Sequence, residues 1–179
     1  RRALEDSMRR NNEVLSSVLD NLPCGLTLFD GAMQLMLHNS RWAQLYALPA
    51  DFFTGEPVSV DKVAGLMHAR REYGEISEAQ ALEAARQRAR DAMQAPHYWE
   101  RSRPGGLILE MRSAPLPGGG FVTTYTDVSE QRRAAVELAQ ALALLRAVLD
   151  AASQVLIVAT DRERRIRVFN RGAELMLGY

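Results

Sequence analysis

The chain has 179 residues, of which 47% are hydrophobic and 25% charged, as is typical of a globular protein. Its 22 basic residues balance its 22 acidic residues, so no net charge attracts nucleic acid or an anionic membrane surface. No run of about 18 apolar residues occurs in the sequence, which argues against a membrane-spanning helix. Cys24 is the only cysteine, which excludes an internal disulfide and favours a reducing, cytoplasmic location.

Residues 1–22 are predicted to form a helix that ends at Pro23. Its apolar positions follow a heptad spacing, interrupted by one polar position, Asn11. The apolar positions are Leu4, Met8, Leu15, Val18 and Leu22. A coiled coil and an amphipathic helix lying on its own domain both fit a seam of this length.

Two short strands and a block of helices follow. The strands are expected at residues 26–30 and 34–38, and Asn39 is a good N-cap for a helix over residues 40–48. A second helix is predicted from Lys62 to about Tyr73, with Asp61 as its cap. A third is predicted over residues 78–95, because Ser77 and Gln80 have the spacing of a capping box.

Three further strands are predicted after Pro96, the first over residues 97–103. Leu107, Leu109 and Met111 then alternate with more polar residues, and the same alternation returns after the glycine turn at residues 118–120. In that last strand the alternating residues are Phe121, Thr123 and Tyr125. Two strands before the helices and three after them predict an α+β fold, a five-stranded antiparallel sheet with helices on one face.

The segment from Glu130 to Ala152 is predicted to be a linker helix with an unbroken heptad seam. The seam includes Leu138, Leu142, Leu145 and Leu149. Three continuous heptads favour a parallel two-stranded coiled coil over a packed surface helix, and hence a homodimer. Asp127 is placed to cap this helix together with Glu130.

The sequence then begins to repeat itself. Residues 145–150 correspond to residues 15–20 at an offset of 130, and Asp161 corresponds to Asp30 at an offset of 131. Asn170 falls on Asn39 at the same offset of 131. The sequence therefore predicts one complete domain and the start of a second copy. Because the chain lacks an initial Met and stops within an apparent helix, we expect it to be a piece of a longer protein.

Three motifs carry a resemblance to a known family. They are Leu22-Pro23-Cys24-Gly25, the segment PLPGGGFVTTYTDVSE at residues 115–130, and FNRGAELMLGY at the end of the chain. Together they resemble the PAS sensory domain of bacterial sensor histidine kinases and of enzymes that make or degrade cyclic di-GMP. The resemblance implies a helix at 1–22, a PAS domain at 23–129, a signalling helix at 130–152 and a truncated second PAS domain at 153–179.

The resemblance also implies a place for a ligand, between the sheet and its helices. The residues expected there are Leu28, Trp42, Tyr46, Leu66, Leu109 and Tyr125. The same aromatic residues also fit a core that is packed solid. Asp127 and Ser129 match the family's junction between the last strand and the output helix, where they also fit plain helix capping.

The cofactors known in the family find little support in these residues. Cys24 precedes the first strand, whereas a flavin photosensor needs a cysteine within a helical motif. His68 and His97 are the residues that a haem iron would use, and neither has a companion at metal-ligand spacing. No catalytic motif is present. The sequence thus predicts a non-catalytic, cytoplasmic sensor module with an unidentified small-molecule ligand or none, and alternatively a dimerisation spacer with a packed core.

Overall fold

The computed structural model describes residue 10 and residues 13–178. Residues 13–20 are helical, as predicted. The predicted seam positions Leu4, Met8 and Asn11 lie outside the described residues. The chain divides into two compact units, residues 1–129 and residues 130–179.

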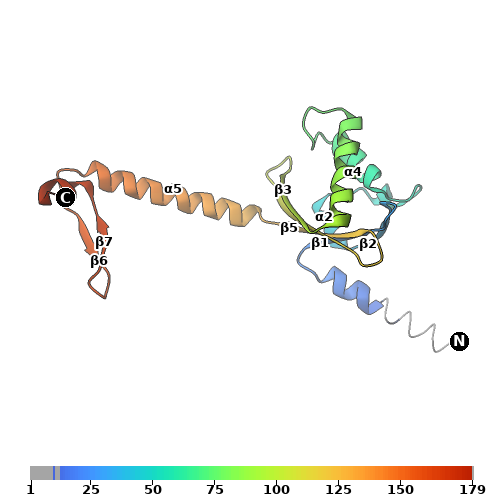
Figure 1. The fold of residues 1–179 in the computed structure, drawn as a ribbon, viewed down its shortest axis with the longest axis horizontal. Coiled ribbons are helices and arrows are strands. Elements are labelled where there is room, and N and C mark those ends of the chain that lie inside the picture. Colours follow the sequence, from blue (N-terminus) through green and yellow to red (C-terminus); the bar gives the residue numbers. More distant parts are fainter. Residues whose placement is uncertain (1–9, 11–12, 179) are drawn as a thin grey trace. The chain divides into compact units, whose positions relative to one another are not determined.

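A five-stranded antiparallel sheet forms the centre of the first unit, in the order β2-β1-β5-β4-β3 (Figure 1). Its strands are β1 (Gly25–Phe29), β2 (Leu35–His38), β3 (His97–Ser102), β4 (Ile108–Pro115) and β5 (Phe121–Asp127). The chain leaves the sheet after β2 and returns at the opposite edge, so that the first and last strands pair at the centre. The α+β fold predicted from the sequence is confirmed.

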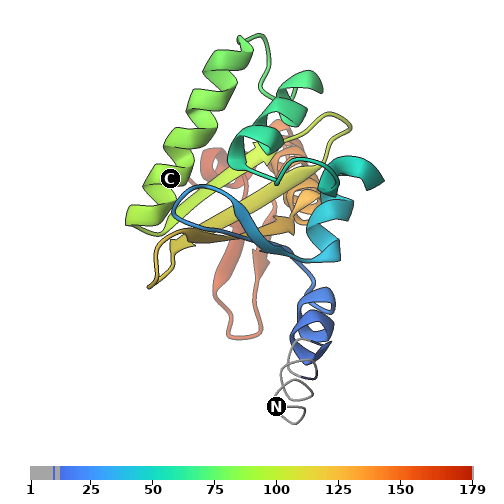
Figure 2. The ribbon, with the colours of Figure 1, turned by 90° about the vertical axis from the view of Figure 1, so that its right-hand side faces the viewer.

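Helices α3 and α4 lie over one face of this sheet, and α2 packs against β1 (Figure 2). The helical elements are α2 (Ser40–Leu45), the 3-10 helix η1 (Ala50–Phe53), α3 (Val60–Ala69) and α4 (Glu78–Gln94). The capping box of α4 is confirmed, since Ser77 and Gln80 each hydrogen-bond the other's backbone. Asn39 caps α2 as predicted, although α2 ends at Leu45, three residues early.

Helix α3 begins earlier than predicted, and Asp61 is not its cap. The cap is Ser59, whose extended backbone lets its hydroxyl accept from the Lys62 amide at 3.1 Å. Asp61 lies inside the first turn and instead accepts two hydrogen bonds from Arg86 of α4, at 2.6 and 2.8 Å. Hydrogen bonding to Arg86 holds the pKa of Asp61 below its usual value. The predicted cap is therefore a link between two helices.

The core between helices and sheet consists of two neighbouring clusters. The larger contains aromatic and long apolar side chains, and its buried members include Trp42, Tyr46, Phe52, Met67, Leu109, Met111 and Tyr125. The smaller lies beneath α4, where Phe29 and Phe121 stack with ring centroids 5.3 Å apart. Ala89 and Ala92 are the buried residues of α4 in this cluster, and their small side chains allow the helix to approach the sheet closely.

The turn between β4 and β5 depends on one glycine. Gly120 has a φ of +86°, and a Cβ built on it would lie 2.1 Å from the carbonyl oxygen of Phe29. Both the left-handed backbone and the contact with β1 therefore exclude any side chain at this position. The glycine run predicted to be a simple turn thus also lets the hairpin lie against the neighbouring strand.

The second unit repeats the start of the first. Helix α5 (Ser129–Ala151) leads into the antiparallel strands β6 (Val158–Thr160) and β7 (Ile166–Phe169), and α6 (Arg171–Leu177) follows. Val158 pairs with Phe169 as Thr27 pairs with His38, and both hairpins carry an irregularity after their second residue pair. The internal repeat predicted from the sequence is confirmed at the level of strand register.

Asn39 is the residue that ties the start of the first unit together. It is 1% exposed. Its Oδ1 accepts from the amides of Leu26 and Trp42, at 2.8 and 3.1 Å. Its Nδ2 donates to the carbonyls of Leu19 and Cys24, at 2.8 and 2.9 Å. One side chain thus joins the end of the N-terminal helix, the following loop, β1 and the first turn of α2.

Asn170 makes the equivalent bonds in the second unit, together with one further donation from Nδ2 to the Ala152 carbonyl at 3.0 Å. Its Oδ1 accepts from Ile157 and Ala173, at 2.9 and 3.0 Å, and its Nδ2 donates to Leu149 and Val155, at 3.1 and 2.9 Å. Relative to the partners of the first asparagine, the offset is 130 at Leu149 and 131 at Val155. The extra residue therefore lies in the loop between helix and strand, earlier than the sequence comparison placed it.

Candidate functional site

A cavity of about 90 Å³ lies between the sheet and helices α3 and α4. Most of its lining is apolar, and includes Phe29, Val60, Val63, Ala64, Met67, Ala85, Ala89, Ala92, Met111 and Phe121. Its polar lining comes from Tyr46, Tyr73, Arg88, Trp99, Arg101, Ser113, Thr123 and Tyr125. The cavity therefore combines an apolar body with a few polar groups, which is the usual composition of a small-molecule site.

Two of the six residues predicted to form the pocket line this cavity, Tyr46 and Tyr125. Trp42 and Leu109 are fully buried beside them in the packed core, and Leu66 is half-buried against the same cluster. The structure brings these five residues into one cluster, with the cavity at one side of it.

Leu28 lies on the opposite face of the sheet from the predicted pocket. In β1 the buried residues alternate as Gly25, Thr27 and Phe29, which places Leu28 on the other face. Thr27 is buried at the centre of the strand because its hydroxyl lies 3.2 Å from that of Tyr125. The prediction for Leu28 was wrong because both faces of this strand carry apolar side chains.

Two pairs of hydroxyl groups in and around the cavity are hydrogen-bonded, Thr27 with Tyr125 and Ser113 with Thr123. Ser113 and Thr123 are hydrogen-bonded across β4 and β5 at 2.7 Å. Burial raises the pKa of Tyr46 and Tyr125, and the nearby charge of Arg101 works in the opposite direction at both. Both phenols are therefore neutral hydrogen-bonding groups at physiological pH.

A buried ion pair closes the core next to the cavity. Arg103 donates to both carboxylate oxygens of Glu72, at 2.7 and 2.6 Å, and the two side chains are only 8% and 2% exposed. Arg103 also donates to the carbonyl of Leu45, and its guanidinium carbon lies 4.6 Å from the ring centroid of Tyr46. The carboxylate raises the pKa of Arg103. The contacts of Arg103 are all with groups of the protein itself, so we assign it a structural role.

Arg88 and Arg101 differ from Arg103, because no acidic partner neutralises either of them among the described residues. Their guanidinium carbons lie 5.8 and 4.7 Å from the ring centroid of Tyr73. Trp99 also lines the cavity, and its Nε1 is buried without a hydrogen-bond partner. Sequence reasoning missed these residues, although the alternation of β3 indicates that Trp99 and Arg101 share a face.

The histidines that were weighed as metal ligands have protein contacts instead. His68 Nε2 donates to the carbonyl of Ile76 at 2.9 Å, and His97 Nδ1 lies 3.2 Å from the Ala95 carbonyl. Within the described residues, no group of three His, Cys, Asp or Glu side chains is placed to hold a metal ion. Residue 10 and residues 13–178 likewise include no helix with the length and apolarity needed to cross a membrane.

Asp127 and Ser129 form a compact junction where the sheet ends. The Oδ1 of Asp127 accepts from both the amide and the hydroxyl of Ser129, at 2.9 and 2.6 Å. The Ser129 hydroxyl oxygen in turn accepts from the amide of Ile108, at 2.8 Å. The start of β4, the end of β5 and the first residue of α5 are thus joined by one buried hydroxyl. Asp127 thus caps the start of the helix through Ser129, two residues further along the chain.

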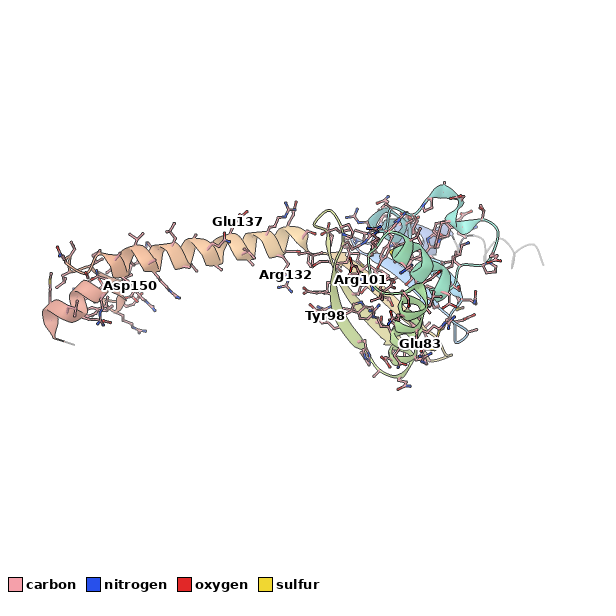
Figure 3. All side chains as sticks on the ribbon, turned by 90° about the horizontal axis from the view of Figure 1, so that it is seen from above. Glu83, Tyr98, Arg101, Arg132, Glu137 and Asp150 are labelled. Carbon is pink, nitrogen blue, oxygen red and sulfur yellow. The ribbon has the colours of Figure 1, made fainter. Side chains whose placement is uncertain are left out.

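The predicted seam residues of α5 lie on the surface of the single chain. Leu138, Leu142 and Leu145 are 62%, 47% and 55% exposed, while Leu149 is half-buried. The charged side chains Glu137 and Asp150 lie on the same helix (Figure 3). The leucines of the predicted seam thus lie on an exposed face of α5, and the coiled coil stays a prediction.

Family models place most of the chain in one family. A model described as "PAS fold" matches residues 19–136, and one described as "PAS domain" matches residues 143–179. "Sensor protein DivL" of Caulobacter vibrioides is 23% identical over 172 residues, covering 96% of this chain and 22% of the relative. The chain therefore spans about a fifth of the length of that curated relative.

Two solved PAS domains are among the structures to which this chain is similar. The PAS domain of Bordetella pertussis BvgS is 16% identical, covers 74% of this chain and 98% of its own, and has a TM-score of 0.47. The PAS domain of an HTR-like protein from Haloarcula marismortui is 15% identical, with coverages of 71% and 99% and a TM-score of 0.46. On the family-model match over residues 19–136, this chain belongs to the PAS family.

Proposed function

We propose that this chain is the sensing and relay segment of a longer, cytoplasmic signalling protein. A small molecule binds in the cavity, the junction at Asp127 and Ser129 passes the resulting strain to α5, and α5 carries it to the second PAS unit as part of a homodimer. The output domain is a histidine kinase or an enzyme of cyclic di-GMP metabolism. Support for the signalling context comes from the family match and from the relative, which is itself a sensor protein.

The observation that carries this proposal is the position of the junction relative to the cavity. Strands β4 and β5 supply Met111, Ser113, Thr123 and Tyr125 to the cavity wall. The hydrogen bonds around Ser129 join the start of β4 to the end of β5. A ligand that changes the spacing of these strands therefore changes the geometry of the first residue of α5. A hydrogen bond of this kind is worth about 1 kcal/mol, enough to shift a balanced equilibrium severalfold.

Removing the central hydroxyl tests the relay. In Ser129→Ala the amide of Ile108 loses its acceptor and Asp127 loses one donor, so we expect faster hydrogen exchange at Ile108 and in the first turn of α5. Ser102→Ala, an equally small change at an exposed position on β3, is the matched control and should leave this exchange unchanged. Equal exchange in wild type and Ser129→Ala would show that the junction does not hold the helix.

Charging the seam tests the dimer. Leu142→Glu with Leu145→Glu places carboxylates where two helices would meet, and we expect light scattering to report monomers. Leu144→Glu is the matched control, because Leu144 lies off the seam and is 67% exposed. A dimer that survives the double change, or one that Leu144→Glu also dissociates, would contradict the predicted seam.

A further inference from the structure

The cavity holds positive charge that nothing in the described part of the chain neutralises. Arg88 reaches it from α4 and Arg101 from β3, and both lie within contact of the Tyr73 ring. Figure 3 labels Arg101 on the strand that also carries Tyr98. Arg101 is half-buried, so water screens its guanidinium less than it screens an arginine on the open surface.

The rest of the same unit shows how this fold treats an arginine that has only a structural role. Arg103 has Glu72 as a bidentate partner, and Arg86 has Asp61. Arg70, which has no acid, donates to two backbone carbonyls at 2.5 and 2.8 Å. Arg41 and Arg71 also have no acceptor among the described residues, but neither lines this cavity. Arg88 and Arg101 do line it, which points to an acceptor bound there.

Trp99 gives an independent indication. Its Nε1 is a donor with no acceptor, it is buried, and its side chain lines the same cavity. Leaving such a donor unsatisfied is unfavourable, and buried indole N–H groups usually have a partner. The other buried donor of this kind in the described residues is Trp42 Nε1, whose side chain is not part of the cavity lining. Only the Trp99 group is therefore available to something inside the cavity.

The remaining lining limits the size and character of an occupant. Apart from Arg88, the residues that α3 and α4 contribute to the wall are valine, alanine and methionine, which suit an aliphatic body. A volume of about 90 Å³ is well below the roughly 300–1,000 Å³ of a drug-sized site, which favours a small occupant.

We propose that the cavity binds a short-chain aliphatic carboxylate. The carboxylate accepts from the guanidinium of Arg101, aided by the charge of Arg88, and from Nε1 of Trp99. The aliphatic chain lies against α3 and α4. This inference rests on the proposed function, since it names the ligand class of the sensor cavity, and planar forked donors are suited to a carboxylate.

Calorimetry on the full 179-residue chain at constant ionic strength tests it, with butyrate as the probe. Butyramide is the neutral isostere and sulfate the anion without an apolar body. Fluorescence provides a second readout, because one of the two tryptophans lines the cavity. We expect butyrate to bind, and butyramide and sulfate to bind at least about tenfold more weakly, the effect of one charge-assisted hydrogen bond.

Arg101→Gln should weaken butyrate binding by at least about tenfold and leave butyramide binding unchanged. Trp99→Phe keeps an aromatic ring but removes the indole N–H donor, so it should weaken the binding of both butyrate and butyramide. Arg88→Gln changes an exposed position and should weaken butyrate binding less than Arg101→Gln does. It serves as a second variant if Arg101→Gln, at a half-buried position, unfolds. The matched control is Arg112→Gln, on the opposite face of the same sheet, where the arginine pairs with Glu110 at 2.7 Å.

Three outcomes would overturn the carboxylate. They are butyramide binding as tightly as butyrate, sulfate binding as tightly as butyrate, and no butyrate binding at millimolar concentration. If butyramide binds as tightly as butyrate, the proposed sensor function still holds, with a neutral ligand. The same is true if native mass spectrometry finds a neutral molecule that copurifies with the chain. A wild-type chain that neither binds nor copurifies any small molecule would count against the sensor function itself.

Discussion

Replacing Asn39 by alanine should strongly destabilise the first unit. Its side chain is buried and satisfies two amides and two carbonyls that belong to four different segments. Alanine removes all four bonds at positions that are largely screened from water. Of the four backbone groups, the Leu19 carbonyl retains another partner, the Leu22 amide at 3.3 Å. The change also removes the N-cap of α2.

The size of the effect follows from the number of bonds. Each of the four hydrogen bonds contributes about 1 kcal/mol net, so Asn39→Ala should lower the free energy of unfolding by about 4 kcal/mol. A domain of this size is stable by about 5–15 kcal/mol, so the variant retains little margin. The loss should be shared by the loop at Cys24 and the helix end at Leu19, which would fray first.

Urea unfolding followed by tryptophan fluorescence measures this loss, because both tryptophans, Trp42 and Trp99, lie in the first unit. Asn170→Ala is the matched control. It removes the equivalent bonds from the second unit and should leave the fluorescence transition unchanged. A loss below about 1 kcal/mol for Asn39→Ala would refute the bond count, since that is the value of a single bond.

Asn39→Asp separates the two halves of the network. The carboxylate still accepts from Leu26 and Trp42, but it faces the carbonyls of Leu19 and Cys24 with no proton to donate. Repulsion raises the pKa of the new carboxyl above its unfolded value of about 3.9. Stability is therefore greatest below that pH and is lost as the pH rises through the folded pKa. A pH-independent loss would contradict this assignment of donors and acceptors.

Two further predictions concern the turn and the buried phenols. Gly120→Ala forces a side chain onto the Phe29 carbonyl and should cost more than about 2 kcal/mol in urea unfolding, whereas Gly118→Ala, with no atom within 4 Å, should change stability by less than about 0.5 kcal/mol. Because burial raises the pKa of Tyr46 and Tyr125, an ultraviolet titration of the folded chain should show at least two fewer phenolates near pH 10 than the urea-unfolded chain. The free energy of unfolding should fall as the pH rises above 10, the pKa of tyrosine in the unfolded chain. If all phenols of the folded chain ionised near pH 10, Tyr46 and Tyr125 could not be buried as described.

The parts of the fold that the sequence predicted are those determined locally. Period-two alternation identified the buried face of β4 and of β5, and the spacing of Ser77 and Gln80 identified the start of α4. The repeat was visible because Asn170 has the same role as Asn39, and that role needs the same side chain in the same local setting. The family resemblance supplied a place for a ligand between the sheet and its helices, whereas the order of the strands was not predicted, because local patterns do not determine it.

The parts that sequence reasoning missed depend on contacts between distant segments. Thr27 is buried because Tyr125 from the last strand supplies its hydrogen-bond partner, so the buried face of β1 could not be identified from β1 alone. Arg101 and Tyr73 are brought together by the return of the chain to the sheet edge after α4. An arginine in a strand is ordinarily interpreted as solvent-facing, and only its neighbours in three dimensions show otherwise.

A sensor and a spacer place different demands on the interior of the first unit. A spacer gains stability from any substitution that fills the cavity or removes an unsatisfied donor, since an unpaired buried N–H costs about 1–3 kcal/mol and the walls of a void lose dispersion contacts. The chain instead keeps Trp99 and Arg101 at the cavity. It also places the cavity wall and the bonds around Ser129 on the same two strands. The unsatisfied donor and the void make this interior less stable than a solid core would be, and the strands that line the void lead to α5. A bound ligand explains this arrangement better than packing alone. Carboxylate binding and the Ser129 junction should therefore be tested on the same protein.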